Sequence, residues 1–133
     1  MFCEKPDGSD LFLEVSSLSK EGVYKEAVRG LAFMTGAYFG AHTGREEPFS
    51  IRGSSDEEIL VLLLEEVLFR NSKDGNTRLP VSVHGEKGNL TGRFVLYKPF
   101  FTETLLTVKG VTWHGLSFIF EGSCWRATLL FDL

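Results

Sequence analysis

The stretch Ser55-Asp56-Glu57-Glu58-Ile59-Leu60-Val61-Leu62-Leu63-Leu64-Glu65-Glu66-Val67-Leu68-Phe69-Arg70 carries the strongest secondary-structure signal in the sequence. Ser55 and Glu58 form a capping box, in which a serine oxygen and a glutamate carboxylate accept hydrogen bonds from backbone N–H groups that the first turn leaves unpaired. Acidic residues also suit the positive end of a helix dipole. The pattern predicts a helix from Ser55 to about Arg70. Apolar residues on most of its circumference predict deep burial.

A second helix is predicted earlier in the chain. Ser19 is a good N-cap residue, and the helix should end near Gly36. Its apolar side chains recur at helical spacing along one face, at Tyr24, Ala27, Val28 and Leu31. This spacing is typical of a helix that packs one side on a core.

The remaining segments read as strands and turns. Residues 40–45 are predicted to form a loop and residues 72–76 a turn, and Gly115 is predicted to mark a bulge or bend. Pro80 is expected at the beginning of a strand or in an edge strand. The predicted strands are 11–16, a short one at 49–51, 79–84, 90–97, 104–120 and 124–131. Two helices inserted among strands predict an α+β fold, a two-layer sandwich of two helices on a largely antiparallel or mixed sheet. The whole chain, 1–133, is predicted to be a single domain.

Composition narrows the possible partners and locations. The chain has 14 basic and 18 acidic residues, a net charge of −4, and no dense run of Lys and Arg, so direct nucleic-acid binding is not expected. The longest apolar run, Ile59 to Leu64, is too short to cross a bilayer, and no secretory signal opens the sequence. We therefore expect no membrane association and a cytoplasmic location. Cys3 and Cys124 are expected to be free thiols, with a disulfide as the alternative. Cys124 is expected to be a small core residue.

Common catalytic signatures are missing from the sequence. It has no phosphate-binding glycine loop, no GxSxG and no HExxH motif, and its three histidines are far apart. Glu65 and Glu66 interrupt the apolar helix and are either a polar stripe or a catalytic base. Asp132 beside the final carboxylate of Leu133 brings two negative charges together, a repulsion that a cation would relieve.

Several segments resemble the archease family. The segment Val108-Lys109-Gly110-Val111-Thr112-Trp113-His114 and the ending Phe131-Asp132-Leu133 are similar to the family's V-K-A-(V/I)-T-Y-H segment and terminal F-D-(I/L). Leu64 to Phe69 is similar to its L-x-E-L-L-F helix. When the sequence is aligned without gaps from the first helix, residues 6–10 correspond to the family's D-H-T-A-D. Asp10 then takes the place of the second Asp. The sequence thus looks like a divergent member.

The resemblance implies a function, a metal site and a partner. Archease is a non-enzymatic accessory protein of the RtcB-type RNA-splicing ligase, which joins a 3′-phosphate or cyclic phosphate end to a 5′-hydroxyl using GTP. A divalent cation, Ca²⁺ or Mg²⁺, is implied at Asp10, Asp132 and Leu133. Lys109 matches the family's functional lysine, and Asp7 is a further candidate at the partner-binding site. Without the resemblance, Lys109 reads as an ordinary lysine on a strand edge, and Thr112 and Trp113 are predicted to pack in the core or across strands.

The sequence also departs from the family pattern, and alternatives stay open. Pro6, Asp7 and Gly8 replace the first Asp and the His-Thr of the amino-terminal motif, and Phe12 replaces a small glycine. One alternative is a chaperone-like protein-binding module that uses Phe100 and Phe101 and has a vestigial metal site. The other is a small metal-dependent phosphoester hydrolase with Glu65 or Glu66 as base. The oligomeric state is not predicted.

Overall fold

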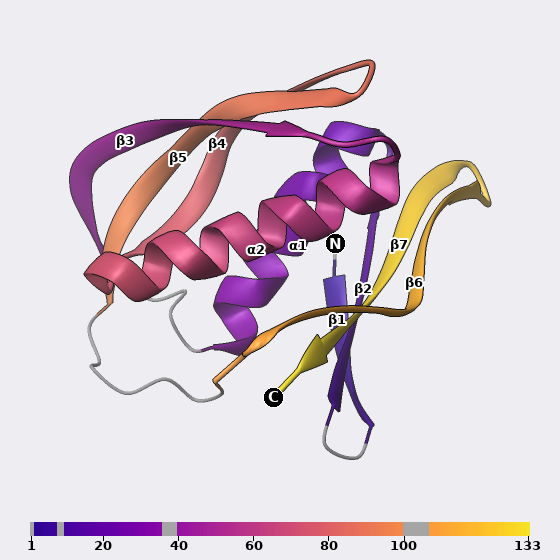
Figure 1. Ribbon diagram of the computed structural model, residues 1–133, viewed down its shortest axis with the longest axis horizontal. Helices are drawn as coiled ribbons and strands as arrows, with labels where there is room; N and C mark the ends of the chain where they lie inside the picture. Colours follow the sequence, from indigo (N-terminus) through magenta and orange to yellow (C-terminus); the bar gives the residue numbers. More distant parts are fainter. Residues whose placement is uncertain (1, 8–9, 36–39, 100–106) are drawn as a thin grey trace.

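The computed structural model describes residues 2–7, 10–35, 40–99 and 107–133, except for the side chains of residues 2–7, 10 and 114. Its helices are inserted among the strands, and all of these elements are labelled in Figure 1. In chain order they are β1 (Phe2–Asp7), β2 (Asp10–Ser17), α1 (Lys20–Met34), β3 (Gly40–Arg52), α2 (Asp56–Asp74), β4 (Thr77–Glu86), β5 (Asn89–Pro99), β6 (Gly110–Glu121) and β7 (Cys124–Asp132).

The strands form two sheets. One has the order β1-β2-β7-β6 and the other the order β3-β5-β4, and all neighbouring strands are antiparallel. Each helix contacts both sheets: α1 packs on β2 and β4, and α2 packs on β6 and β3 (Figure 1). The predicted α+β fold, with two helices packed on antiparallel β-structure, is confirmed. Each helix links the two sheets, so the packing places one core between them.

Both helices begin where the sequence predicts. Ser19 Oγ accepts a hydrogen bond from the N–H of Gly22 at 3.0 Å, and Ser55 Oγ accepts one from the N–H of Glu58 at 3.1 Å. The carboxylate of Glu58 reaches back to the N–H of Ser54 at 2.9 Å, which completes the cap of α2. The predicted end of α2 at Arg70 is wrong, since the helix continues to Asp74 and stops at Gly75, where φ is +75°.

Three strand predictions need correction. Strand β1 was not predicted at all. Residues 40–45 are the beginning of β3 and not a loop, with an irregularity in the pairing with β5 between His42 and Glu46. The strand expected from residue 104 is described as strand only from Gly110. Pro80 was expected at a strand start or edge, and it lies in β4, an edge strand of its sheet, next to a register irregularity.

The core is apolar and continuous. Its fully enclosed side chains come from both sheets and from the helices, among them Leu13, Leu64, Phe94, Leu129 and Phe131. Helix α2 was expected to be buried around most of its circumference. This is wrong for the side that carries Leu62 and Phe69, because both side chains are exposed. Within the described residues, neither helix is long and apolar enough to span a membrane.

A buried arginine joins the end of α2 to β3 and β4. Arg78, on β4, is 4% exposed, and its guanidinium donates to both carboxylate oxygens of Asp74, at 2.7 and 3.0 Å. It also donates to both carboxylate oxygens of Glu47 on β3 and to Asn71. Arg70 binds Glu47 from the other side at 2.9 Å. This cluster explains why α2 extends beyond Arg70, since the continued helix brings Asn71 and Asp74 to Arg78.

The cluster predicts a stability loss in acid. Hydrogen bonds from Arg78 hold the pKa of Asp74 at about 2, below its ordinary value, and they also lower the pKa of Glu47. A carboxyl group with a lowered pKa in the folded state stabilises the fold above its unfolded pKa, and this contribution disappears as the pH falls towards the folded value. We expect the free energy of unfolding in urea to fall between about pH 4 and pH 2, and Asp74→Asn to reduce that slope. An equal slope in both proteins would contradict the assignment.

Candidate functional site

The amino-terminal hairpin and the end of the chain meet where the strands of the four-stranded sheet end, on one side of that sheet. Asp10 on β2 is the register partner of Asp132 on β7, and Asp7 on β1 is the partner of Asp10. Gly110 on β6 pairs with Asp132 from the other side. Directly opposite Cα atoms in antiparallel strands are roughly 4.5–5.5 Å apart. We call these positions, with Lys109 and Leu133, the acidic corner.

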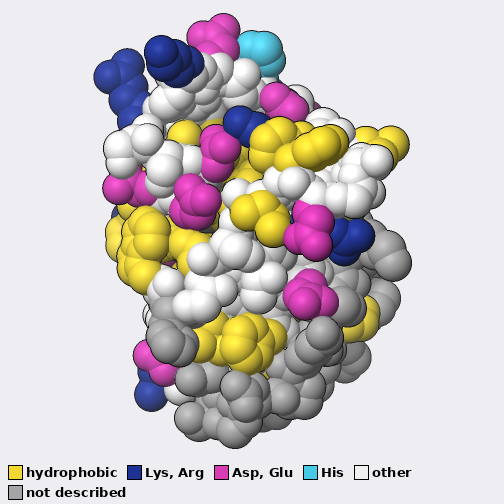
Figure 2. Space-filling model, turned by 90° about the vertical axis from the view of Figure 1, so that its right-hand side faces the viewer, with side chains coloured by type: hydrophobic (Ala, Val, Ile, Leu, Met, Phe, Trp, Pro, Cys, Tyr) yellow, Lys and Arg dark blue, Asp and Glu magenta, His cyan; other side chains and the backbone are white. Residues whose placement is uncertain are grey.

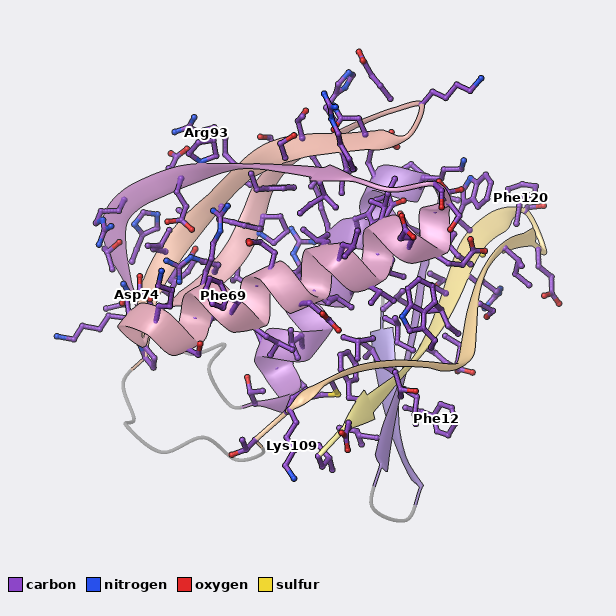
Figure 3. All side chains as sticks on the ribbon, in the orientation of Figure 1. Phe12, Phe69, Asp74, Arg93, Lys109 and Phe120 are labelled. Carbon is purple, nitrogen blue, oxygen red and sulfur yellow. The ribbon has the colours of Figure 1, made fainter. Side chains whose placement is uncertain are left out.

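A backbone hydrogen bond joins Lys109 to Asp132. The N–H of Lys109 donates to the main-chain oxygen of Asp132 at 2.7 Å, which extends the pairing of β6 with β7 by one residue. The side chains of Lys109 and Asp132 are both exposed, and Figure 3 shows Lys109 extending away from the sheet. A cationic and an anionic side chain are therefore both open to a partner at this end of the molecule.

The structure brings the predicted site residues together at the level of the backbone. The side chains of Asp7 and Asp10 are outside the described part, so their contacts with a metal are not placed. Among the side chains that are described, no group of three or more His, Cys, Asp or Glu is arranged to hold a metal ion. The donors that the corner offers from Asp132 and Leu133 are oxygens.

Glu65 and Glu66 lie elsewhere. Both line a groove between α2 and β3, together with Arg52, Leu62 and Phe69, and none of the acidic-corner residues lines it. Glu66 is paired with Arg70 at 3.5 Å, and Glu65 is exposed. The structure thus places the polar stripe on the solvent side of α2. It does not place a base beside the expected cation.

Other sequence predictions have mixed outcomes. Phe100 and Phe101 lie outside the described residues. Cys124 has a free thiol, but it is half-buried, and its Sγ donates to the main-chain oxygen of Glu121 at 3.6 Å, so it is not the core residue that was expected. Trp113 was predicted to pack in the core or across strands. Instead, its side chain is 55% exposed.

A second cavity lies apart from the acidic corner. It has a volume of about 560 Å³ and lies between the starts of α1 and α2 and the β4–β5 hairpin. Tyr24 donates to the main-chain oxygen of Asp56 there at 3.5 Å, and Lys20 forms an ion pair with the Asp56 carboxylate at 2.9 Å. Burial, followed by the charge of Asp56, raises the pKa of Tyr24 well above its usual value. The tyrosine therefore stays protonated and helps to join the two helix starts.

Comparisons with known proteins agree with this fold. The model of the archease protein family matches residues 2–133. The chain is similar to the crystal structure of an archease, described as a possible chaperone, from Thermotoga maritima, with 21% identity, a TM-score of 0.71, and 97% of this chain and 96% of that chain covered. It is also similar to the solution structure of protein 1598 from Methanobacterium thermoautotrophicum, with 16% identity, a TM-score of 0.78, and 99% and 98% covered. No curated protein sequence matches the chain.

Proposed function

Because the chain belongs to the archease family, we propose that it is a protein cofactor of an RNA-splicing ligase. It would promote guanylylation and repeated turnover of the ligase, which joins a 3′-phosphate to a 5′-hydroxyl, without joining RNA itself. The observation that supports this proposal is the strand register, which brings Asp10, Asp132 and Lys109 together at neighbouring strand ends. The proposal places the protein in the cytoplasm with its partner.

The residues of the acidic corner fit a hard divalent cation. Like charges directly opposite each other on neighbouring strands destabilise the pair, and Asp10 and Asp132 occupy such positions. Ca²⁺ and Mg²⁺ prefer carboxylate and main-chain oxygens, which Asp10, Asp132 and Leu133 offer. The bound cation would supply positive charge that holds the two chain ends together. The chain's own contribution is to bring oxygen donors from β2 and β7 to one position.

Lys109 is proposed to contact the partner. A lysine beside carboxylates and a cation presents a mobile positive charge that can meet a phosphate or a carboxylate of another molecule. Its backbone is fixed by the hydrogen bond to Asp132, while its side chain is exposed. The position of Lys109 would therefore depend on the same strand end that holds the metal ligands, and Asp7 at the outer strand would complete this surface.

A chaperone-like role is the second candidate. The Thermotoga archease is described as a possible chaperone, and large hydrophobic side chains are exposed on this protein, including Phe69, Trp113 and Phe120. On the face shown in Figure 2, hydrophobic side chains form several patches between acidic ones. In this alternative the protein would hold a client through apolar contacts, and the metal would not be required.

Guanylylation of a purified ligase tests the proposal. With GTP and metal present, we expect the protein to increase the rate of ligase guanylylation and the number of ligation turnovers, and we expect Asp132→Ala and Lys109→Ala to abolish this increase. Both positions are exposed, so the variants should fold, which thermal unfolding will verify. Glu65→Ala, an exposed acid on α2, is the matched control and should stimulate like the wild type.

Other results would separate the alternatives. Unchanged single- and multiple-turnover rates on addition of the wild type, or full stimulation by Asp132→Ala, contradict the ligase proposal. Suppression of client aggregation that survives both chelation of the metal and Asp132→Ala supports the chaperone-like role. Hydrolysis of phosphoesters by the protein alone, lost on chelation, would instead favour the hydrolase that the sequence left open.

A further inference from the structure

Strand β6 contains a large bulge close to the acidic corner. Thr112 pairs with Leu130 and Ser117 with Thr128, so β6 advances five positions while β7 moves only two. Three extra residues are therefore accommodated between these pairs. Gly115, inside this segment, has a φ of +73°, a left-handed conformation that favours glycine. Bulges of this kind often occur next to functional sites, where they redirect a side chain.

The bulge redirects Trp113. Side chains alternate between the faces of a regular strand, and Val111 faces the core with 8% exposure. A regular β6 would place Trp113 on the same buried side as Val111. Instead the indole is 55% exposed. An exposed large apolar side chain that strand alternation would have buried is more informative than one on an ordinary solvent face.

Apolar side chains on the outer face of the sheet lie next to the bulge. Phe12 on β2 pairs with Leu130 on β7, which pairs with Thr112 on β6. Leu130 is only 5% exposed, although alternation along β7 places it on the face opposite the core residue Leu129. A methyl group built on Gly115 would lie 3.9 Å from Cε1 of Phe12. Gly115, in the bulged segment, therefore lies next to the Phe12 ring.

Trp113 is close to the acidic corner. It follows Gly110, the register partner of Asp132, by three residues, which is roughly 10 Å along a strand. Exposed tryptophans are enriched at protein–protein contacts and often dominate their energetics. The neighbouring acids at positions 7, 10 and 132 disfavour the phosphates of a nucleic acid or of an anionic membrane. These features together favour a protein as the occupant of this surface.

We infer that the β6 bulge presents Trp113 as the anchor through which the acidic corner binds its protein partner. The inference rests on the proposed function, with the RNA ligase as that partner. The matching surface on the ligase has an apolar recess for the indole, next to an acidic side chain that meets Lys109. Trp113 supplies affinity, and the charged residues of the corner act on the bound ligase.

Binding of the full-length protein to the purified ligase, measured by calorimetry, tests the inference. We expect Trp113→Ala to weaken binding by about tenfold or more, which is typical of a central aromatic contact. Trp113→Tyr should retain most of the affinity. Phe120→Ala is the matched control, because Phe120 lies at the far end of the same strand with 60% exposure, and it should bind like the wild type. The melting temperature and Ca²⁺ affinity of Trp113→Ala should equal those of the wild type.

Each other outcome has a distinct meaning. Equal binding by Trp113→Ala and the wild type overturns the inference and leaves the proposed function intact. If the wild type forms no complex with the ligase, the proposed function fails, and this inference fails with it. If the wild type self-associates in sedimentation and Trp113→Ala does not, the anchor binds a second copy of the chain and the inference is wrong.

Discussion

Arg78→Met is expected to lower the free energy of unfolding by about 3 kcal/mol, at the lower end of the range for removal of one partner from a buried charged pair. The guanidinium is 4% exposed and makes contacts with Glu47, Asp74 and Asn71. Without it, two carboxylates face each other across the end of α2. The loss stays at the lower end because Glu47 keeps its bond to Arg70, and methionine fills part of the vacated volume.

Urea unfolding followed by circular dichroism measures this effect. Arg93→Met is the matched control, because Arg93 pairs with Glu46 at 3.1 Å through side chains that are half exposed. Exposed pairs of this kind contribute about 0–1 kcal/mol. If the two variants lose similar stability, the cluster around Arg78 does not hold α2 to the sheets. Because the acid-induced loss has the same origin, Arg78→Met should also unfold with a smaller dependence on pH below about pH 4.

Features set by neighbouring residues could be predicted from the sequence. The two capped helix starts depend on a side chain and a backbone group three residues apart, and Ser19 and Ser55 are both confirmed. The end of α2 could not be predicted in this way. Asn71 and Asp74 look like turn residues locally, yet their side chains bind Arg78 on the next strand. This tertiary contact overrides the local preference for a turn.

Features set by distant residues could not be predicted. The first half of β3 contains Gly44 and charged side chains, which locally indicate a loop, and it forms a strand only because β5 pairs with it from about 50 residues away. Strand β1 likewise depends on β2 for its pairing. Hydrophobic alternation is absent where a strand has no buried face, and the burial pattern of residues 40–47 shows almost none.

The acidic corner was predicted only in part. Hydrophobic periodicity does not indicate that Asp10 meets Asp132, and that expectation came from the resemblance to archease. The structure places the two residues in register, and their role in metal binding stays a prediction. Trp113 was missed because alternation along β6 predicts a packed side chain. The glycine at position 115 signalled a bulge, but its length depends on the pairing of β6 with β7.

Calcium is expected to stabilise the wild type and not Asp132→Asn. A ligand that binds only the folded state adds about 2.7 kcal/mol at a concentration of 100 times its dissociation constant, which corresponds to a rise of roughly 5–10 °C in melting temperature for a chain of this size. The carboxylate of Asp132 is a proposed ligand, so the amide should remove most of that rise. Asp10→Asn should do the same if both strands contribute ligands.

Without metal, the order of stability should reverse. Asp10 and Asp132 are directly opposite each other in the register, and like charges in such positions are destabilising. After chelation, Asp132→Asn should therefore melt at the same temperature as the wild type or slightly above it, although it melts well below it in calcium. A crossing of this kind cannot come from a simple packing defect, which would lower the melting temperature in both conditions. If calcium raises the melting temperatures of wild type and Asp132→Asn equally, the cation binds elsewhere and the acidic corner is not its site.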